Sequence, residues 1–274
     1  MLLGAGGMLH RAWRELFERR QIAHDSMGRD QLDLRDRVGI EKAIAGHRLV
    51  INCAAYTNVD GAEKEEAVAN EVNGAAVGNL ARACRQRGAL LVHYSTDYVF
   101  NGRGKRPYRP GDVIEPVNTY GRSKALGEKL IRESECEHLI IRTSWLYAPW
   151  GKNFVRTIVA FLQKNHPLRI VNDQTGRPSS AQELARSSMK LIEKGARGFF
   201  HLADGGECTW FEFTKEIAAQ VNPEAKVDWC KTQELGRAAA RPAYSVLDVE
   251  ESELLIGPMK PWRDALADVI RRLE

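Results

Sequence analysis

The chain has 274 residues, of which 43% are hydrophobic and 28% are charged, so it can bury a sizeable core beneath a charged surface. Its formal net charge of +4 is spread along the sequence without a long basic run, which argues against a dedicated nucleic-acid-binding protein. Its five cysteines are far apart and form no Cys-x-x-Cys pair, so we expect neither a disulfide framework nor a metal site.

The chain opens with MLLGAGGMLHRAWREL, which predicts a short strand at Met1–Leu3, a glycine turn and a helix from Met8 to about Arg20. Positive charges follow this apolar start rather than precede it, which is the reverse of a signal peptide. No apolar run in the chain is long enough to cross a bilayer. Because the cysteine pattern also suits a reducing compartment, we expect a cytoplasmic protein that does not contact membranes.

Strand-like and helix-like segments alternate through the first half of the chain. Leu49–Ile51 form a short apolar run that predicts a buried strand. A long helical pattern extends from about Glu63 to Arg87, where Gly88 is suited to a C-cap. The next predicted elements are a strand within 89–100, a helix at 119–134 and a strand within 138–147. This alternation predicts βαβ units, a parallel sheet and right-handed crossovers.

The pattern becomes less regular after about Tyr147. We expect a helix within 152–165, a strand, loop and helix within 168–195, and a strand and helix within 198–221. The predicted fold is α/β, a Rossmann-like, doubly wound parallel sheet with a smaller C-terminal substrate-binding lobe. We place an NAD(P)-binding domain at residues 1–146, with a segment at about 168–192 returning to it, and the lobe mainly at 147–274.

The glycine turn is the first candidate binding site. Gly4 and Gly7 lie between the first strand and the first helix, where backbone N–H groups can face a pyrophosphate. An ordinary glycine-rich turn is the alternative interpretation. His10 stands where a third glycine would allow close packing of helix and strand, and the first strand is unusually short. Either the native start lies upstream of Met1, or the binding site tolerates an edge that is weakened by this short strand.

The segment after the second predicted strand bears on the choice of cofactor. Asp25 could bind a ribose 2′-hydroxyl and Arg29 could bind a 2′-phosphate. Both residues could equally be solvated charges in a loop. The sequence therefore leaves NADH and NADPH open.

Tyr120 and Lys124 are the strongest candidates for chemistry. They lie one helical turn apart in NTYGRSKALGEKLI, so they share one face of the predicted helix. A phenol with a pKa of about 10 is a weak acid near neutrality, and a neighbouring ammonium lowers that pKa. Thr96, at the end of the preceding predicted strand, could donate a hydrogen bond to an oxyanion. The alternatives are a packing tyrosine, a solvated lysine and a strand-end cap.

Nine segments along nearly the whole chain occur in the order typical of one family. They are GAGGML, INCAAYTNVDGAE, NEVNGAAVGNLA, YSTDYVFNG, PVNTYGRSKALGEK, IIRTSWLYAPWGKNFV, VNDQTGRPSSAQELA, FHLADGGECTWFEF and RPAYSVLD. In these segments the sequence resembles the extended short-chain dehydrogenases/reductases and, among them, the dTDP-4-dehydrorhamnose reductases. The resemblance implies that NADPH or NADH reduces the C4 ketone of dTDP-4-dehydro-L-rhamnose during nucleotide-sugar synthesis for surface polysaccharides. It also implies that Tyr120 and Lys124 are the acid–base pair and that Thr96 assists them.

The resemblance assigns binding roles to further residues. Cofactor contacts are implied for Gly4, Gly7, Met8, Leu9, Asp33, Leu34, Ala54, Ala55, Tyr56, Thr57, Tyr120 and Lys124. Contacts with the dTDP-sugar are implied for Thr96, Asp97, Trp145, Asn153 and Arg241. An N-cap is an equally good interpretation of Asn153, as is an ion pair of Arg241, and Trp145 could be a core residue. Asn73 matches a helix asparagine common in the wider family.

Several alternatives remain beside this interpretation. Ala12 stands where some relatives carry a metal-binding glutamate at a dimer contact, so a metal-bridged dimer of that type is not expected, and a homodimer stays open. A nucleotide-sugar dehydratase would need a glutamate at the position of Tyr98. An epimerase or another nucleotide-sugar reductase would use the same Tyr120 and Lys124. A non-catalytic NAD(P)-binding regulatory subunit would share the fold, but the intact catalytic residues argue against it.

Overall fold

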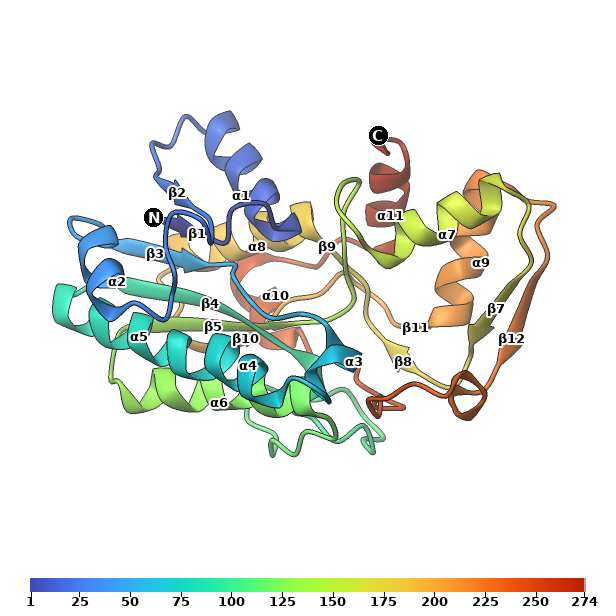
Figure 1. Ribbon diagram of the computed structural model, residues 1–274. Coiled ribbons are helices and arrows are strands. Elements are labelled where there is room, and N and C mark those ends of the chain that lie inside the picture. Colours follow the sequence, from blue (N-terminus) through green and yellow to red (C-terminus); the bar gives the residue numbers. More distant parts are fainter. Residues whose placement is uncertain (274) are drawn as a thin grey trace.

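The computed structural model describes residues 1–273, and a six-stranded parallel sheet lies at its centre (Figure 1). The strand order is β10-β5-β4-β3-β1-β2. The bounds are β1 Leu2–Leu3, β2 Ser26–Met27, β3 Leu49–Asn52, β4 Leu90–Thr96, β5 His138–Thr143 and β10 Gly198–His201. The order reverses direction after β1, and the predicted doubly wound parallel sheet is therefore confirmed.

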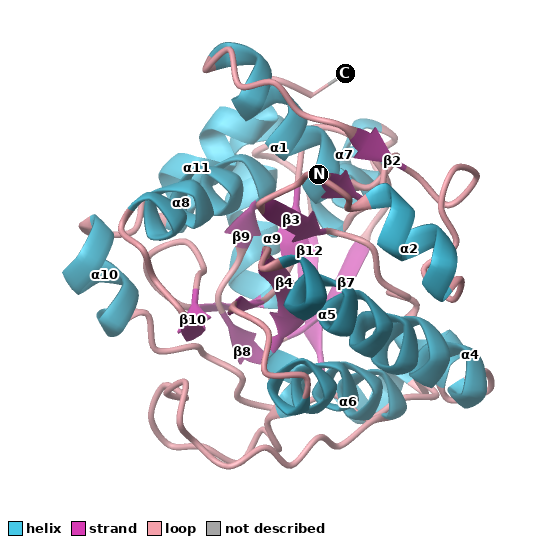
Figure 2. Ribbon diagram, turned by 90° about the vertical axis from the view of Figure 1, so that its left-hand side faces the viewer, coloured by secondary structure: helices cyan, strands magenta, loops and turns pink. Residues whose placement is uncertain are grey.

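Helices cover both faces of this sheet (Figure 2). One face carries α1 Met8–Arg19, α8 Ala181–Glu193 and α10 Glu250–Ile256, which pack against one another through α8. The opposite face carries α2 Arg37–Ala43, α5 Ala76–Arg87 and α6 Thr119–Glu133. Because both faces are covered, the central strands are mostly apolar, and every residue of β4 is buried.

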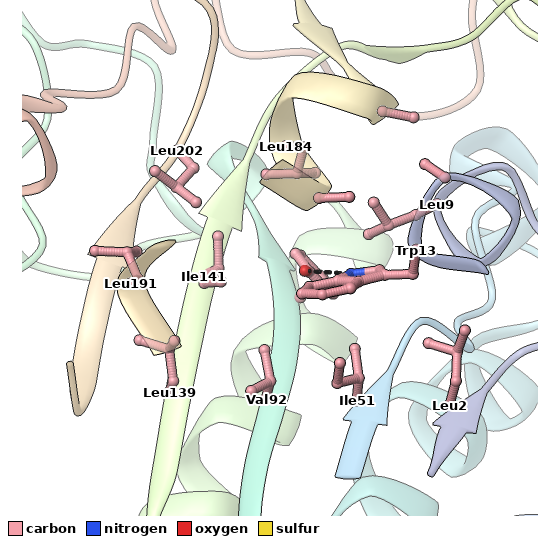
Figure 3. Packing of buried hydrophobic residues seen from close by; sticks show 14 of the residues in the cluster. Leu2, Leu9, Trp13, Ile51, Val92, Leu139, Ile141, Leu184, Leu191 and Leu202 are labelled. Atoms are coloured by element: carbon pink, nitrogen blue, oxygen red, sulfur yellow. Dashed lines mark hydrogen bonds between the residues drawn. The ribbon is translucent and has the colours of Figure 1, made fainter. Parts of the chain in front are cut away.

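The core between α1, α8 and the sheet is built around Trp13 (Figure 3). Its indole N–H donates to the Tyr94 hydroxyl at 2.8 Å, and that hydroxyl donates to the Ser188 Oγ at 2.9 Å. This chain of hydrogen bonds satisfies the polar atoms that a buried tryptophan and tyrosine bring with them. It ties the first helix, the central strand and α8 together directly behind the glycine turn.

The helix predicted at 63–87 is divided in the structure. It consists of α4 Glu66–Asn70, a π-helical turn at Glu71–Ala75, and α5, and the short helix α3 Val59–Ala62 precedes it. The predicted end is confirmed, because Gly88 adopts a left-handed φ of 62° at the C-cap. The extra residue of the π turn buries Asn73 between this helix and α6, where a single regular helix was expected.

A second lobe lies beside the sheet (Figure 1), and its segments alternate in sequence with the last elements of the first domain. It contains α7 Phe154–Gln163, α9 Trp210–Val221 and α11 Trp262–Ile270 around a separate core, and a parallel pair of strands, β7 Leu168–Val171 and β12 Val227–Cys230. Short strand pairs join β6 Leu146–Tyr147 to β9 Ser179–Ser180 and β8 Thr175–Gly176 to β11 Cys208–Thr209. Thr209 and Glu212 form a capping box at the N-terminus of α9.

The segment expected to return to the first domain differs from the prediction. β7 pairs with β12 in the lobe, so residues 168–171 do not join the central sheet. The return begins at α8 and includes β10 and α10, which lie beyond the predicted end at 192. Within residues 1–273, none of the helices has both the length and the apolar character needed to cross a membrane.

Candidate functional site

A cleft of about 1090 Å³ lies beyond the carboxyl ends of β1, β3, β4 and β5, between the sheet and the lobe. This is the edge at which open parallel sheets bind ligands. The predicted site residues that line it are Gly4, Gly7, Met8, Leu9, Asp33, Leu34, Ala54, Ala55, Tyr56, Thr57, Thr96, Asp97, Tyr120, Lys124, Trp145 and Asn153. The structure thus brings together the predicted site residues, except Arg241 and the ribose candidate Asp25, which do not line the cleft.

The glycine turn lies directly against the end of β3. Gly4 has a φ of 90°, and a Cβ atom there would lie 2.7 Å from the Ala54 backbone nitrogen. Gly6 also has a φ of 90°, and Gly7 is the N-cap of α1, with no side chain capping that end of the helix. The first-turn N–H groups of α1 are therefore available to an anion, because a helix N-terminus leaves four of them without partners inside the helix.

His10 does not prevent the helix from packing against the sheet. Its side chain is buried, and its Nε2 atom has no hydrogen-bond partner. Burial, followed by the charge of Arg14, lowers the pKa of His10, so the ring is neutral near physiological pH. The position that a third glycine would occupy is thus filled by an uncharged imidazole on the core side of α1.

The end of the cleft beside β2 is lined by charges of both signs. Asp33 accepts hydrogen bonds from the Arg35 guanidinium at 2.5–2.9 Å, and these bonds lower the pKa of Asp33 to about 2. Asp25 does not line the cleft: its carboxylate lies 2.8 Å from the His47 ring, which corrects its suggested role at the ribose. Arg29 lines the cleft and is exposed, so of the two sequence candidates only Arg29 is in place for a ligand.

Thr96, Asp97 and Tyr120 lie together past the end of β4. The Thr96 hydroxyl donates to Asp97 Oδ1 at 3.0 Å and accepts from the Tyr98 N–H at 3.2 Å. Asp97 Oδ2 is buried without a hydrogen-bond partner. Burial raises the pKa of Asp97 to about 7, and hydrogen bonds from Ser245 and Thr96 offset only part of that effect. This carboxyl group therefore titrates near neutrality inside the cleft.

The environment of Tyr120 differs from the sequence expectation. Burial, followed by the nearby Asp97 carboxyl, raises the pKa of Tyr120 to about 12, whereas the lysine was expected to lower it. The hydrogen bond with Thr96 acts in the opposite direction but is smaller. The phenol therefore holds its proton at neutral pH, which is the state a proton donor needs.

Lys124 is 2% exposed and lies at the floor of the cleft. Its Nζ atom donates to the Tyr94 carbonyl oxygen at 2.6 Å and lies 3.3 Å from Nε2 of the buried His93. Burial lowers the pKa of Lys124 to about 8, while the charge of Glu128 acts to raise it. Glu128 is held by Arg142 through two hydrogen bonds of 2.9 and 2.8 Å, and both of these side chains are buried.

Asn73 fixes the loop that follows β3. Its amide accepts from the Tyr56 N–H at 2.9 Å, donates to the Tyr56 carbonyl oxygen at 3.0 Å and donates to the Ser123 Oγ at 2.9 Å. The Ser123 hydroxyl in turn donates to the Tyr120 carbonyl oxygen at 2.8 Å. The π-helical turn thus links the predicted cofactor loop at 54–57 to the first turn of α6.

Trp145 forms part of the wall on the lobe side. Its φ of 47° is unusual for a bulky residue and breaks the strand predicted at 138–147 into β5 and β6. The indole stacks on Trp210 of α9 with ring centroids 3.6 Å apart. A Cβ atom at Gly176 would lie 2.7 Å from the Trp145 ring, so glycine is needed there. Trp145 thus lines the cleft with its ring held in place by Trp210 and Gly176.

Two predicted substrate contacts have other partners. Asn153 lines the cleft, but its amide caps α7 by accepting from the Arg156 N–H and donates to the carbonyl oxygens of Ala148 and Trp150. Arg241 does not line the cleft, and its guanidinium binds the Asp60 carboxylate at 2.6 and 2.8 Å. Asn153 is thus an N-cap and Arg241 forms an ion pair, as the alternative interpretations of these two residues predict.

Sequence reasoning missed the polar side chains beneath the site. His93 and Asn52 are both buried, with His93 Nδ1 lying 3.1 Å from the Asn52 amide nitrogen. The signal available in the sequence was a histidine inside an otherwise apolar strand. Among residues 1–273, no group of three or more His, Cys, Asp or Glu side chains is arranged to hold a metal ion.

Comparison with known proteins agrees with this geometry. Residues 1–274 match the family model described as RmlD substrate binding domain. The chain is 37% identical to dTDP-4-dehydrorhamnose reductase of Streptomyces griseus, covering 98% of this chain and 91% of that protein. It is 34% identical to dTDP-4-keto-6-deoxy-D-glucose reductase of Streptomyces niveus, covering 97% and 94%. The crystal structure of dTDP-4-dehydrorhamnose reductase from Bacillus anthracis in complex with NADP superposes with a TM-score of 0.95 at 34% identity, covering 98% and 97%.

Proposed function

The chain belongs to the dTDP-4-dehydrorhamnose reductase family, and we propose that it reduces the C4 ketone of dTDP-4-dehydro-L-rhamnose to dTDP-L-rhamnose with NADPH. It is an NAD(P)H-dependent oxidoreductase that acts on nucleotide sugars. The observation that carries the proposal is the convergence of Thr96, Tyr120 and Lys124 at the end of the cleft that begins at the glycine turn. The five free cysteines of the chain favour a reducing, cytoplasmic setting.

The residues of the cleft fit a dinucleotide. The glycine turn leaves no room for a Cβ atom at Gly4, and the uncapped N-terminus of α1 suits a pyrophosphate. Arg29 lines the same cleft beyond β2, where a guanidinium suits a 2′-phosphate. Asp25, the residue suited to a free 2′-hydroxyl, is engaged with His47 instead. These positions favour NADPH over NADH.

The cofactor, when bound, supplies the hydride that adds to the carbonyl carbon of the sugar. Tyr120 holds the proton that the carbonyl oxygen requires, because its raised pKa keeps the phenol protonated. As Tyr120 gives up that proton, an ammonium on Lys124, one helical turn away, stabilises the phenolate. The Thr96 hydroxyl donates to Asp97 in the structure, so it must rotate to donate to the substrate oxygen.

The lobe supplies the surface on which a sugar nucleotide would rest. Trp145 presents an aromatic ring that is fixed by its stack on Trp210 and by the close approach of Gly176. A rigid aromatic wall suits the flat faces of a pyrimidine or a sugar ring. The relative from Streptomyces niveus is named for a different 4-keto sugar, so dTDP-4-keto-6-deoxy-D-glucose is the second candidate substrate.

Other reactions of this fold fit the site less well. Tyr98 occupies the position at which a dehydratase would carry its glutamate base, and its ring lies edge-on to Tyr120 with centroids 6.0 Å apart. Burial, followed by the charge of Asp97, raises the pKa of Tyr98, so it is not a base near neutrality. A regulatory subunit would not need to keep Thr96, Tyr120 and Lys124 together.

The proposal is tested by measuring NADPH and NADH oxidation with purified protein and a panel of dTDP- and UDP-linked 4-keto sugars. We expect turnover with dTDP-4-dehydro-L-rhamnose and a higher kcat/KM with NADPH. Tyr120→Phe should lower kcat at least about 100-fold while leaving NADPH binding, measured by fluorescence, within a factor of about three. Near-full activity of that variant would remove Tyr120 from the mechanism. Absence of turnover with any keto sugar would favour a regulatory role.

A further inference from the structure

Lys124 is the first of three polar side chains in a buried chain, and the reaction described above does not use the other two, His93 and Asn52. Lys124 Nζ lies 3.3 Å from His93 Nε2, and His93 Nδ1 lies 3.1 Å from Asn52 Nδ2. The exposed fractions are 2% for Lys124, 0% for His93 and 1% for Asn52. Polar groups so fully removed from water must satisfy one another, so the protons in this chain cannot be arranged freely.

The orientation of the Asn52 amide is set by the backbone. The Ala54 N–H donates to Asn52 Oδ1 at 3.0 Å, so the carbonyl end of the amide faces Ala54 and the NH₂ end faces His93. An amide NH₂ can only donate hydrogen bonds. His93 Nδ1 must therefore be the unprotonated acceptor, which leaves the ring proton of a neutral histidine on Nε2.

That tautomer turns an N–H group toward Lys124. His93 is neutral, because burial, and then the charge of Lys124, lower the pKa of the imidazole well below its ordinary value. A neutral amine can accept the Nε2–H through its lone pair, whereas an ammonium has no lone pair and meets a donor. The Tyr94 carbonyl oxygen, at 2.6 Å, can accept from Lys124 in either state.

We propose that Asn52 and His93 are positioning residues that act through Lys124: by presenting an N–H to Nζ, they determine the pH at which the Tyr120–Lys124 pair loses its proton. This inference rests on the proposed reductase function and deepens it. In the reduction direction the pair must hold a proton for the carbonyl oxygen, so its loss sets the alkaline limb of the activity profile. Reversing the tautomer of His93 would let Nε2 accept from an ammonium and would move that limb to higher pH.

The other ionisable groups around Lys124 do not impose this effect. Glu128, on the same helix, is paired with Arg142 through two hydrogen bonds, and its charge acts to raise the pKa of Lys124, not to lower it. Asp97 acts mainly on Tyr120 and Tyr98. The titratable side chains on the elements packed around the amine include Tyr120 and Glu128 of α6, His93 and Tyr94 of β4, Asp97 after β4, and Cys53 after β3. Of these, only His93 lies within hydrogen-bond distance of Nζ in the described part of the chain.

Asn52→Asp is the variant that tests the inference. An aspartate can still accept from the Ala54 N–H with one oxygen, while its other oxygen accepts a hydrogen bond from His93 Nδ1. The ring proton then moves to Nδ1, and Nε2 becomes an acceptor for the Lys124 ammonium. Asn79→Asp is the matched control, because Asn79 lies on α5, outside the cleft, and its amide oxygen accepts from Arg82.

The first measurement is the tautomer of His93, read from the ¹⁵N shifts of histidine-labelled protein without substrate and assigned with His93→Gln. The wild type should carry its proton on Nε2 and the Asn52→Asp variant on Nδ1. A wild-type ring protonated on Nδ1 would overturn the inference, even if the variant does not fold. Because this readout needs no turnover, it separates failure of the inference from failure of the proposed function.

The second measurement is the pH dependence of kcat/KM at saturating NADPH. On the alkaline limb, kcat/KM falls as the pH rises. If the limb moves up by one pH unit, kcat/KM at a fixed pH above the limb, divided by kcat/KM at pH 7, rises about tenfold. We expect a shift of about one unit in Asn52→Asp and none in Asn79→Asp. Equal limbs in all three proteins, or a shift of Asn52→Asp to lower pH, would contradict the assignment.

Discussion

The buried carboxyl group of Asp97 should make the protein less stable as the pH rises toward neutrality. Its pKa is raised from 3.8 to about 7, chiefly by burial. Between these two values the folded state holds a proton that the unfolded state has released, so the free energy of unfolding falls with increasing pH by up to about 1.4 kcal/mol per unit. A shift of this size corresponds to a penalty of about 4 kcal/mol above pH 7, as an upper bound.

Asp97→Asn should remove this pH dependence while retaining an oxygen that accepts from Thr96. Urea unfolding should be measured at pH 5 and at pH 7.5. The free energy of unfolding of the variant, relative to that of the wild type, should be about 2–3 kcal/mol higher at pH 7.5 than at pH 5. Asp228→Asn, a substitution at an exposed position of β12, is the control. It should change the free energy of unfolding by the same amount at pH 5 and at pH 7.5. A gap between Asp97→Asn and wild type that is constant across pH would show that the carboxyl group is ionised in the folded protein.

Two further predictions concern the frame of the site. Gly4→Ala should weaken NADPH binding and lower the free energy of unfolding by about 2 kcal/mol or more in urea, because its Cβ atom would lie 2.7 Å from backbone at a φ of 90°. Gly88→Ala shares a positive φ but has open space, so it should cost only about 1 kcal/mol and leave binding unchanged. Glu128→Leu should destabilise by about 3–5 kcal/mol in the same assay, because it leaves the buried Arg142 guanidinium without its carboxylate; a loss below 1 kcal/mol would contradict this.

The elements that the sequence predicted well are those whose signal is local. The apolar strands at 49–52 and 90–96 and the helix ending at Gly88 depend on neighbouring residues, and the structure confirms them. The break at Trp145 and the pairing of β7 with β12 depend on contacts between distant parts of the chain, so a helical or strand-like pattern could not reveal them. Patterns among neighbouring residues were therefore enough to predict most strands and helices, whereas features that depend on long-range packing were not predicted.

The site divides in the same way. Motif spacing was sufficient to bring Tyr120 and Lys124 to one helix face, because four residues make about one turn. The pKa of Tyr120 could not be predicted from that spacing, since it depends on burial and on Asp97, which lies on another element. His93 and Asn52 are 41 residues apart, and only the register of β3 beside β4 places them together. Sequence reasoning is therefore least able to predict which residues will be the partners of buried polar groups.

Burial moves the four ionisable groups at the floor of the cleft toward their neutral forms. The pKa is raised to about 7 for Asp97 and to about 12 for Tyr120, and it is lowered to about 8 for Lys124 and well below its usual value for His93. Near pH 7.5 only Asp97 and Lys124 are close to titration, and they carry opposite charges when ionised. A reductase must deliver one proton for each hydride, so a phenol that stays protonated at working pH is in the form that the reaction consumes. Oxidation of an alcohol would instead need the phenolate as a base, which the burial of Tyr120 disfavours.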